Sequence, residues 1–187
     1  KDLEAFDLSK EPEAAHALYG TEKFSKGVLL ARRLVEHGVR FVEVGFGGFD
    51  WHSDAFTKAD EMLPVLDRAY AALLHDLEIK GLLDTTMVVI ATEFGRTPKI
   101  DDDAGRNHFP KAFSFALAGA GIKGGTVYGE TDETASNVIT KKTSPADFNA
   151  TIATAMGLDY DEVVMSPSKR PFRMGGEKGK PIMAVLA

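Results

Sequence analysis

The sequence contains no cysteine, only one tryptophan and no excess of positive charge. The lack of cysteine excludes disulfides, thiolate nucleophiles and cysteine zinc sites. The formal net charge is −6, and the 22 lysines and arginines are dispersed along the chain. Because nucleic acids and anionic membrane surfaces bind basic faces, this balance disfavours both as partners. No apolar run approaches the roughly 20 residues that a membrane span requires.

The composition is typical of a globular protein, with 44% hydrophobic and 27% charged residues in 187. A chain of this length can build one hydrophobic core and buries roughly 70% of its unfolded surface. Apolar positions at helical spacing predict helices over 11–19, 21–37, 56–80 and 145–156. Short β-rich or apolar runs predict strands over 39–44, 86–91, 113–118 and 126–128. Because helices and strands alternate, we expect a single α/β domain over residues 1–187 with a mostly parallel sheet.

Polar loops follow or precede the predicted strands. In open parallel sheets, ligand sites lie beyond the carboxyl ends of the strands. The loops supply these candidates: Asp50, His52 and Asp54; Glu93 and Arg96; Arg106, Asn107 and His108. Carboxylates and imidazoles are ligands for Zn or Mn, and guanidinium groups pair with phosphate or sulfate. The pattern therefore predicts a metal-assisted site for an anionic ester.

Each candidate also has a purely structural interpretation. Asp50 could cap a loop turn, and His52 could cap the helix that follows it. Glu93 and Arg96 could form a structural salt bridge, and His108 could lie in an ordinary surface loop. The residues alone leave these alternatives open.

Trp51 has two interpretations of its own. It could be a platform for the substrate, because its neighbours in the sequence are polar. A lone tryptophan is also a common anchor of a hydrophobic core.

Three segments resemble a known family. Residues 49–52 (Phe-Asp-Trp-His), 93–98 (Glu-Phe-Gly-Arg-Thr-Pro) and 105–110 (Gly-Arg-Asn-His-Phe-Pro) look like the bacterial family catalogued as domain of unknown function 1501. That family resembles the sulfatase and alkaline-phosphatase superfamily. The resemblance implies a three-layer α/β/α fold with a mostly parallel sheet, sulfatase-like and incomplete here. Family members are typically longer and exported, so it also implies a periplasmic or exported C-terminal portion that lacks the nucleophile-bearing part.

The resemblance also implies roles for individual residues. In the superfamily, one metal takes an Asp and a His from one strand-end loop and a second His from a later loop, which Asp50, His52 and His108 match. The second metal takes an Asp-His pair, and here that position reads Glu93-Phe94. Phenylalanine cannot ligate a metal, so Glu93 is left as an additional ligand or general base. The implied cofactor is a divalent ion, Zn, Mn or Ca.

The expected function is hydrolysis of a sulfate or phosphate ester, with a small anionic ester or a sulfated or phosphorylated glycan as substrate. Glu93 and Arg96 are the catalytic candidates, and Arg96, Arg106 and Trp51 are the substrate-binding candidates. The alternative is a degenerate, non-catalytic member of the same superfamily that binds an anion or glycan. A third interpretation is a structural piece of a larger sheet.

Overall fold

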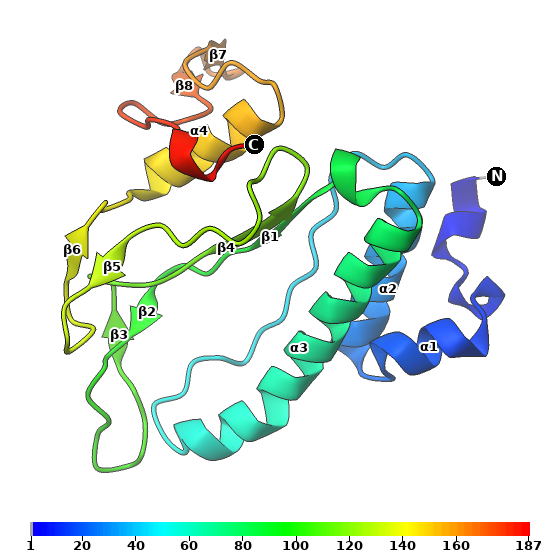
Figure 1. The fold of residues 1–187 in the computed structure, drawn as a ribbon, viewed down its shortest axis with the longest axis horizontal. Helices are drawn as coiled ribbons and strands as arrows, with labels where there is room; N and C mark the ends of the chain where they lie inside the picture. Colours follow the sequence, from blue (N-terminus) through cyan, green and yellow to red (C-terminus); the bar gives the residue numbers. More distant parts are fainter. Residues whose placement is uncertain (1) are drawn as a thin grey trace. The chain divides into compact units, whose positions relative to one another are not determined.

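The computed structural model describes residues 2–187 and divides the chain into two compact units. Unit 1 consists of Lys1–Thr86 and Lys99–His108, and unit 2 of Met87–Pro98 and Phe109–Ala187. Figure 1 labels the α-helices and strands of both units along the chain. The single domain expected over residues 1–187 stays a prediction.

Unit 1 is helical. It contains η1 (Asp2–Phe6), η2 (Leu8–Lys10), α1 (Glu13–Tyr19), α2 (Lys23–Glu36), α3 (Ala55–Ile79) and η3 (Leu83–Thr85). The three helices predicted in this part of the sequence are confirmed to within about two residues at each end. Their apolar faces meet in one cluster of buried side chains: Tyr19, Val28, Leu29, Ala69 and Ala72. Helical spacing was a reliable signal here because each helix buries a continuous apolar stripe.

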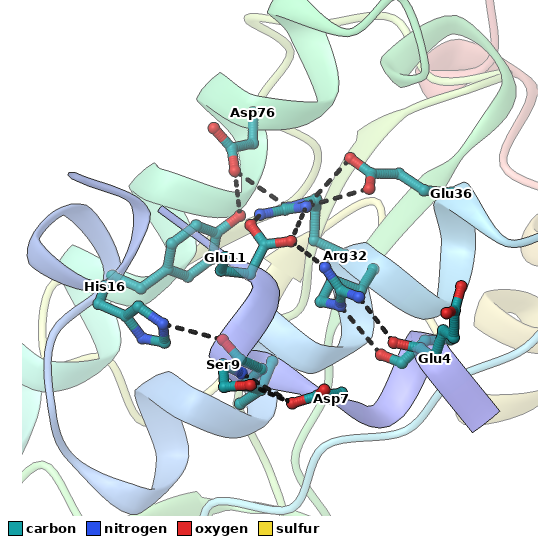
Figure 2. A network of polar contacts seen from close by, with 12 residues as sticks. Glu4, Asp7, Ser9, Glu11, His16, Arg32, Glu36 and Asp76 are labelled. Atoms are coloured by element: carbon teal, nitrogen blue, oxygen red, sulfur yellow. Dashed lines mark hydrogen bonds and ion pairs between the residues drawn. The ribbon is translucent and has the colours of Figure 1, made fainter. Parts of the chain in front are cut away.

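A buried network of charged groups lies beside this core (Figure 2). Arg32 on α2 is only 2% exposed. Its guanidinium group forms ion pairs with Glu11, with Glu36 at 3.0 Å and with Asp76 at 3.1 Å. The Tyr19 hydroxyl donates to Asp76 Oδ2 at 3.0 Å, and burial together with the Asp76 charge raises the pKa of Tyr19. The network thus connects α1, α2 and α3 with the segment before α1.

Arg33, the next residue on α2, holds the N-terminal segment. Its guanidinium group pairs with Glu11 and donates to the carbonyl oxygens of Glu4 at 2.7 Å and Ala5 at 3.0 Å. Because these carbonyls belong to η1, the two adjacent arginines fasten the segment before α1 to the surface of α2.

Residues 39–46 lie in the connection between α2 and α3 and run in an extended conformation (Figure 1). Their exposure alternates, with Val42, Val44 and Phe46 half-buried and Phe41 79% exposed. The three half-buried side chains line an apolar pocket with residues of α2 and α3. No β ladder includes residues 39–44 in the described part of the chain. The strand predicted there is therefore wrong: the local sequence produced an extended, alternating segment, but a strand also needs a hydrogen-bonded neighbour.

Unit 2 carries the β structure and α4 (Pro145–Ala155). Strand β1 (Met87–Ile90) pairs antiparallel with β4 (Ala116–Gly119), from Met87 opposite Gly119 to Ile90 opposite Ala116. Two further antiparallel pairs join β5 (Glu130–Thr131) with β6 (Val138–Thr140), and β7 (Val163–Met165) with β8 (Pro171–Arg173). The remaining elements are β2 (Gly95–Arg96), β3 (His108–Phe109) at the boundary of the units, and η4 (Met183–Val185).

The expected fold class is therefore wrong. In residues 2–187 the strands occur as short pairs in separate two-stranded sheets, accompanied by four α-helices. No parallel, three-layer α/β/α core is present among these residues. The prediction assumed that strands separated by helices lie parallel in one sheet. Instead, residues 39–44 join no ladder, and β1 takes the later segment Ala116–Gly119 as an antiparallel partner.

The smaller strand predictions had mixed outcomes. The runs at 86–91 and 113–118 are confirmed as β1 and, shifted by a few residues, β4. Residues 126–128 are not a strand, and the next strand begins at Glu130. The hairpin of β7 and β8 was missed, because it lies in a segment rich in Pro, Gly and charge.

Helix α4 begins as the sequence predicted. Ser144 is its N-cap: its hydroxyl oxygen accepts from the Asp147 N–H at 3.1 Å, and the Asp147 carboxylate accepts from the Ser144 N–H at 2.9 Å. Pro145 occupies the first turn, where its missing N–H has no cost. No helix in residues 2–187 is both long and apolar enough to cross a membrane, as the sequence also indicated.

Candidate metal centre

Two segments of unit 1 bring an aspartate and two histidines together. Asp50 and His52 lie in the connection before α3, and His108 lies at the end of the 99–108 segment. Asp50 Oδ1 is 3.1 Å from His52 Nε2 and 2.9 Å from His108 Nε2. The two imidazole rings are tilted by 43°, with their centroids 5.0 Å apart. Two segments more than 50 positions apart in the sequence therefore bring three potential donor atoms within 4.8 Å of one another.

These three residues form a group that could hold a metal ion. One donor atom of each residue lies within 4.8 Å of the other two. Ligands at about 2.0–2.1 Å in a tetrahedral zinc site lie about 3.4 Å apart, and the two contacts of Asp50 Oδ1, at 3.1 and 2.9 Å, are close to that spacing. Three protein ligands also leave a coordination position open, as catalytic zinc sites do.

The two segments are joined by main-chain hydrogen bonds. Three N–H groups donate across: Arg106 to the carbonyl of Trp51 at 2.9 Å, Asp54 to that of Asp103 at 3.0 Å, and Ala55 to that of Ala104 at 2.9 Å. Because the backbone itself carries this connection, the spacing between the Asp50–His52 corner and His108 does not depend on their side chains alone.

Gly105 lies where the two segments come closest. A Cβ atom at this position would overlap with the carbonyl group of His52. The Gly105 N–H donates to Asp101 Oδ1 at 2.8 Å, and the Gly105 carbonyl accepts from the Asp101 N–H at 3.1 Å. These two bonds close a tight loop that only glycine can complete without moving His52.

His52 has a second partner on the same loop. Its Nδ1 lies 3.1 Å from Asn107 Oδ1, and Asn107 Nδ2 lies 3.5 Å from Asp101 Oδ2. Sequence reasoning placed Asn107 among the loop candidates without a specific role and did not single out Asp101. One chemical rule could have pointed to Asn107: an imidazole that binds a metal through one nitrogen needs a hydrogen-bond partner for its other nitrogen.

The capping alternative for His52 is wrong. The N-cap of α3 is Asp54, which has a left-handed backbone conformation (φ 51°) and makes no side-chain cap. The Asp50 carboxylate contacts the two histidines. The side chains of Asp50, His52 and His108 are 64%, 49% and 51% exposed, so an ion or substrate can reach them from solvent.

Trp51 is held between the ligand candidates by its own contacts. Its indole N–H donates to the Gly48 carbonyl at 2.6 Å, and its ring lies 5.1 Å from that of Phe49. Phe49 continues a row of aromatic rings through Phe46 to Phe24 on α2. The anchor interpretation thus has physical support, and the role of Trp51 as a substrate platform stays a prediction.

The other predicted site residues are distributed over both units. Arg106 is half-buried and lies two residues before His108 in unit 1. Glu93 is exposed and Arg96 lies half-buried in β2, both in unit 2. The catalytic roles predicted for Glu93 and Arg96 stay predictions.

A family model described as "Protein of unknown function (DUF1501)" matches residues 1–186. The chain belongs to this family. The DUF1501 resemblance drawn from residues 49–52, 93–98 and 105–110 is therefore confirmed. No curated protein and no solved structure matches the chain.

Proposed function

We propose that this DUF1501 protein binds one divalent metal ion through Asp50, His52 and His108 and hydrolyses sulfate or phosphate esters. One observation carries the proposal: two imidazole Nε2 atoms lie within about 3 Å of the same carboxylate oxygen, and the three residues come from segments far apart in the sequence. A carboxylate that accepts from two imidazoles is a common surface arrangement. Here, in addition, the two segments are fixed to each other through the backbone.

The donor set selects the kind of ion. Two imidazole nitrogens and one carboxylate oxygen suit Zn or Mn, whereas Ca prefers oxygen ligands throughout. A divalent ion at this corner would polarise an ester oxygen and lower the pKa of a bound water. Asp50 supplies a negative charge that offsets the charge of the ion, and the two neutral imidazoles leave a net positive centre for an anionic ester.

Arg106 is the group that we assign to the anionic part of the substrate. It lies on the same loop as His108, and its N–H is bonded to the carbonyl of Trp51, beside both first-loop ligands. A guanidinium group binds sulfate or phosphate oxygens through two parallel hydrogen bonds. The sulfatase-like relationship, an exported location and a sulfated or phosphorylated glycan as substrate belong to the same proposal and rest on the family resemblance.

Metal binding by the purified protein tests the first half of the proposal. Calorimetric titration with Zn²⁺ or Mn²⁺ should give one site per chain, and His52→Ala or Asp50→Ala should weaken binding at least about 100-fold, because each removes one of three ligands. His75→Ala is the matched control, since His75 is an exposed histidine on α3. A protein that binds neither ion, or equal affinity in His52→Ala, would overturn the metal site.

Hydrolysis of aryl sulfates and aryl phosphates tests the second half. With the metal-bound water as the attacking group, we expect turnover that depends on the added metal and is lost in Asp50→Asn. Arg106→Lys should raise the KM, because lysine lacks the planar guanidinium group that can form two parallel hydrogen bonds. The alternative function, anion binding without turnover, is favoured by Phe94, which stands where the superfamily places a metal-binding imidazole. Metal-dependent binding of sulfate or phosphate without hydrolysis of either ester class would establish that alternative.

A further inference from the structure

We propose that Asn107 is a positioning residue that selects the tautomer of His52, and that Asp101 in turn fixes the orientation of Asn107. The inference rests on the proposed metal site and adds two residues to it. Both act through His52 without touching the ion.

The orientation of the Asn107 amide follows from its neighbours. Its two ends face different groups: Oδ1 lies 3.1 Å from His52 Nδ1, and Nδ2 lies 3.5 Å from Asp101 Oδ2. An ionised carboxylate can only accept hydrogen bonds. The amide NH₂ must therefore face Asp101, and the amide oxygen is left for His52. The opposite orientation would place the amide oxygen against the carboxylate.

The tautomer of His52 follows from this orientation. An amide oxygen can only accept, so His52 Nδ1 must carry the hydrogen in this contact. When a metal ion takes the place of the hydrogen between Nε2 and Asp50 Oδ1, which lie 3.1 Å apart, the neutral imidazole keeps its hydrogen on Nδ1 and offers the Nε2 lone pair to the ion. That is the tautomer in which His52 can bind a metal together with Asp50 and His108.

Asp101 is itself fixed by the loop. Its Oδ1 accepts from the Gly105 N–H at 2.8 Å, so the carboxylate cannot rotate away from Asn107 without losing a main-chain bond. Gly105 lies against the carbonyl group of His52. His52, Asn107 and Asp101 thus form a hydrogen-bonded relay. Its two ends, the His52 ring and the Asp101 carboxylate, are both held close to the backbone of Gly105.

Calorimetric titration with Zn²⁺ alone, on the purified protein, measures the effect of the relay. Asn107→Leu should weaken Zn²⁺ binding about 10- to 100-fold, the range typical for partners of a metal-binding histidine. Asn149→Leu, at an exposed position of α4, is the matched control and should leave the affinity unchanged. In a His52→Ala background, Asn107→Leu should cause no further loss, because Asn107 acts through that ring.

An exchange variant separates this role from a loss of folding. Asp101→Asn combined with Asn107→Asp keeps the net charge. It also preserves every hydrogen bond of the relay: Asn at 101 accepts from Gly105 and donates to Asp at 107, which accepts from His52. We expect this double variant to bind Zn²⁺ within about threefold of the unchanged protein. Equal weakening in the exchange variant and in Asn107→Leu would overturn the relay.

Tautomer measurement provides a readout that needs no metal. In Asp50→Ala, which removes the competing acceptor near Nε2, the imidazole ¹⁵N shifts at about pH 8.5 should report hydrogen on Nδ1 of His52. Adding Asn107→Leu should move it to Nε2, the preferred tautomer of a free histidine side chain. A hydrogen that stays on Nε2 in Asp50→Ala would overturn the inference. Absence of Zn²⁺ binding in the unchanged protein would instead overturn the proposed function.

Discussion

Gly105 is the residue with the tightest steric constraint at the candidate metal centre. Its α-hydrogen faces the carbonyl group of His52, where a methyl group would overlap. Gly105→Ala should therefore push the loop away from His52, destabilise the protein by about 1–3 kcal/mol and weaken Zn²⁺ binding. Urea unfolding and titration with Zn²⁺ measure the two effects.

Gly45→Ala is the control for this substitution. Gly45 belongs to the same unit, and no heavy atom lies within 4 Å of a Cβ placed there. It should change neither stability nor affinity measurably. If Gly105→Ala behaved like Gly45→Ala, the close approach of the two segments would be disproved.

The ligand candidates were predictable from single residues, and their partners were not. Asp50, His52 and His108 could be proposed because aspartate and histidine at loop positions are recognisable as ligands in a sequence. The roles of Asp101 and Gly105 cannot be recognised from residue type, because aspartate and glycine are ordinary loop residues. Their roles depend on a contact across more than 50 positions, which local sequence does not encode.

Helix α4 shows how a single element depends on its first turn. Ser144 and Asp147 satisfy each other's backbone N–H groups in a capping box, and Asp147 Oδ1 also accepts from the Lys180 N–H at 2.8 Å. Ser144→Ala should cost about 1 kcal/mol of unfolding free energy, since it leaves the Asp147 N–H without its acceptor. Thermal or urea unfolding measures this loss.

Asp147 makes the same element sensitive to acid. Hydrogen bonds from the Ser144 side chain and backbone lower the pKa of Asp147 below its usual value. A lowered folded-state pKa adds stability that is present above the unfolded value, about 3.9, and is lost as the pH falls through the folded value. Asp147→Asn should therefore lower stability at pH 7 and flatten its decline below about pH 4, measured by urea unfolding across pH. Asp67→Asn, at an exposed position of α3, should leave the profile unchanged.

The sequence predicted the helices correctly, but it did not predict which segments pair as strands. The signals that begin α4, Ser144 and Pro145, lie at the helix terminus itself, so the sequence displays them. Residues 39–44 have the composition and alternation of a strand, and the structure places them in an extended conformation without a ladder. Alternation determines which side chains point inward, whereas a ladder requires a second segment that the local pattern does not specify.

At the scale of the molecule, the charged network around Arg32 holds the helices of unit 1 together. Glu11 pairs with both Arg32 and Arg33, and its side chain is only 7% exposed. Burial acts to raise the pKa of Glu11, but hydrogen bonds from the two arginines outweigh it and lower the pKa. This carboxylate thus stabilises unit 1 above the unfolded pKa, about 4.3, and the contribution is lost as the pH falls through the folded value.

Glu11→Gln should consequently destabilise the protein by about 3 kcal/mol at pH 7, because it leaves buried positive charge with one fewer partner. Lys10→Met is the control: it breaks the exposed pair with Glu4, whose side chains are 48% and 60% exposed, and should cost less than about 1 kcal/mol. Urea unfolding of the two variants compares them directly. Equal effects would show that burial of the network adds nothing.

The sequence by itself determined the helices, the membership of the family and the identity of Asp50, His52 and His108 as ligand candidates. Each of these depends on a local pattern or on the chemistry of a single side chain. Only the tertiary structure decided that the strands pair antiparallel in separate sheets. It alone also showed that Asn107 contacts the His52 ring and that Asp101 contacts Asn107. These features depend on contacts between segments distant in the sequence, where packing and hydrogen bonding select one neighbour among many that the local sequence would allow.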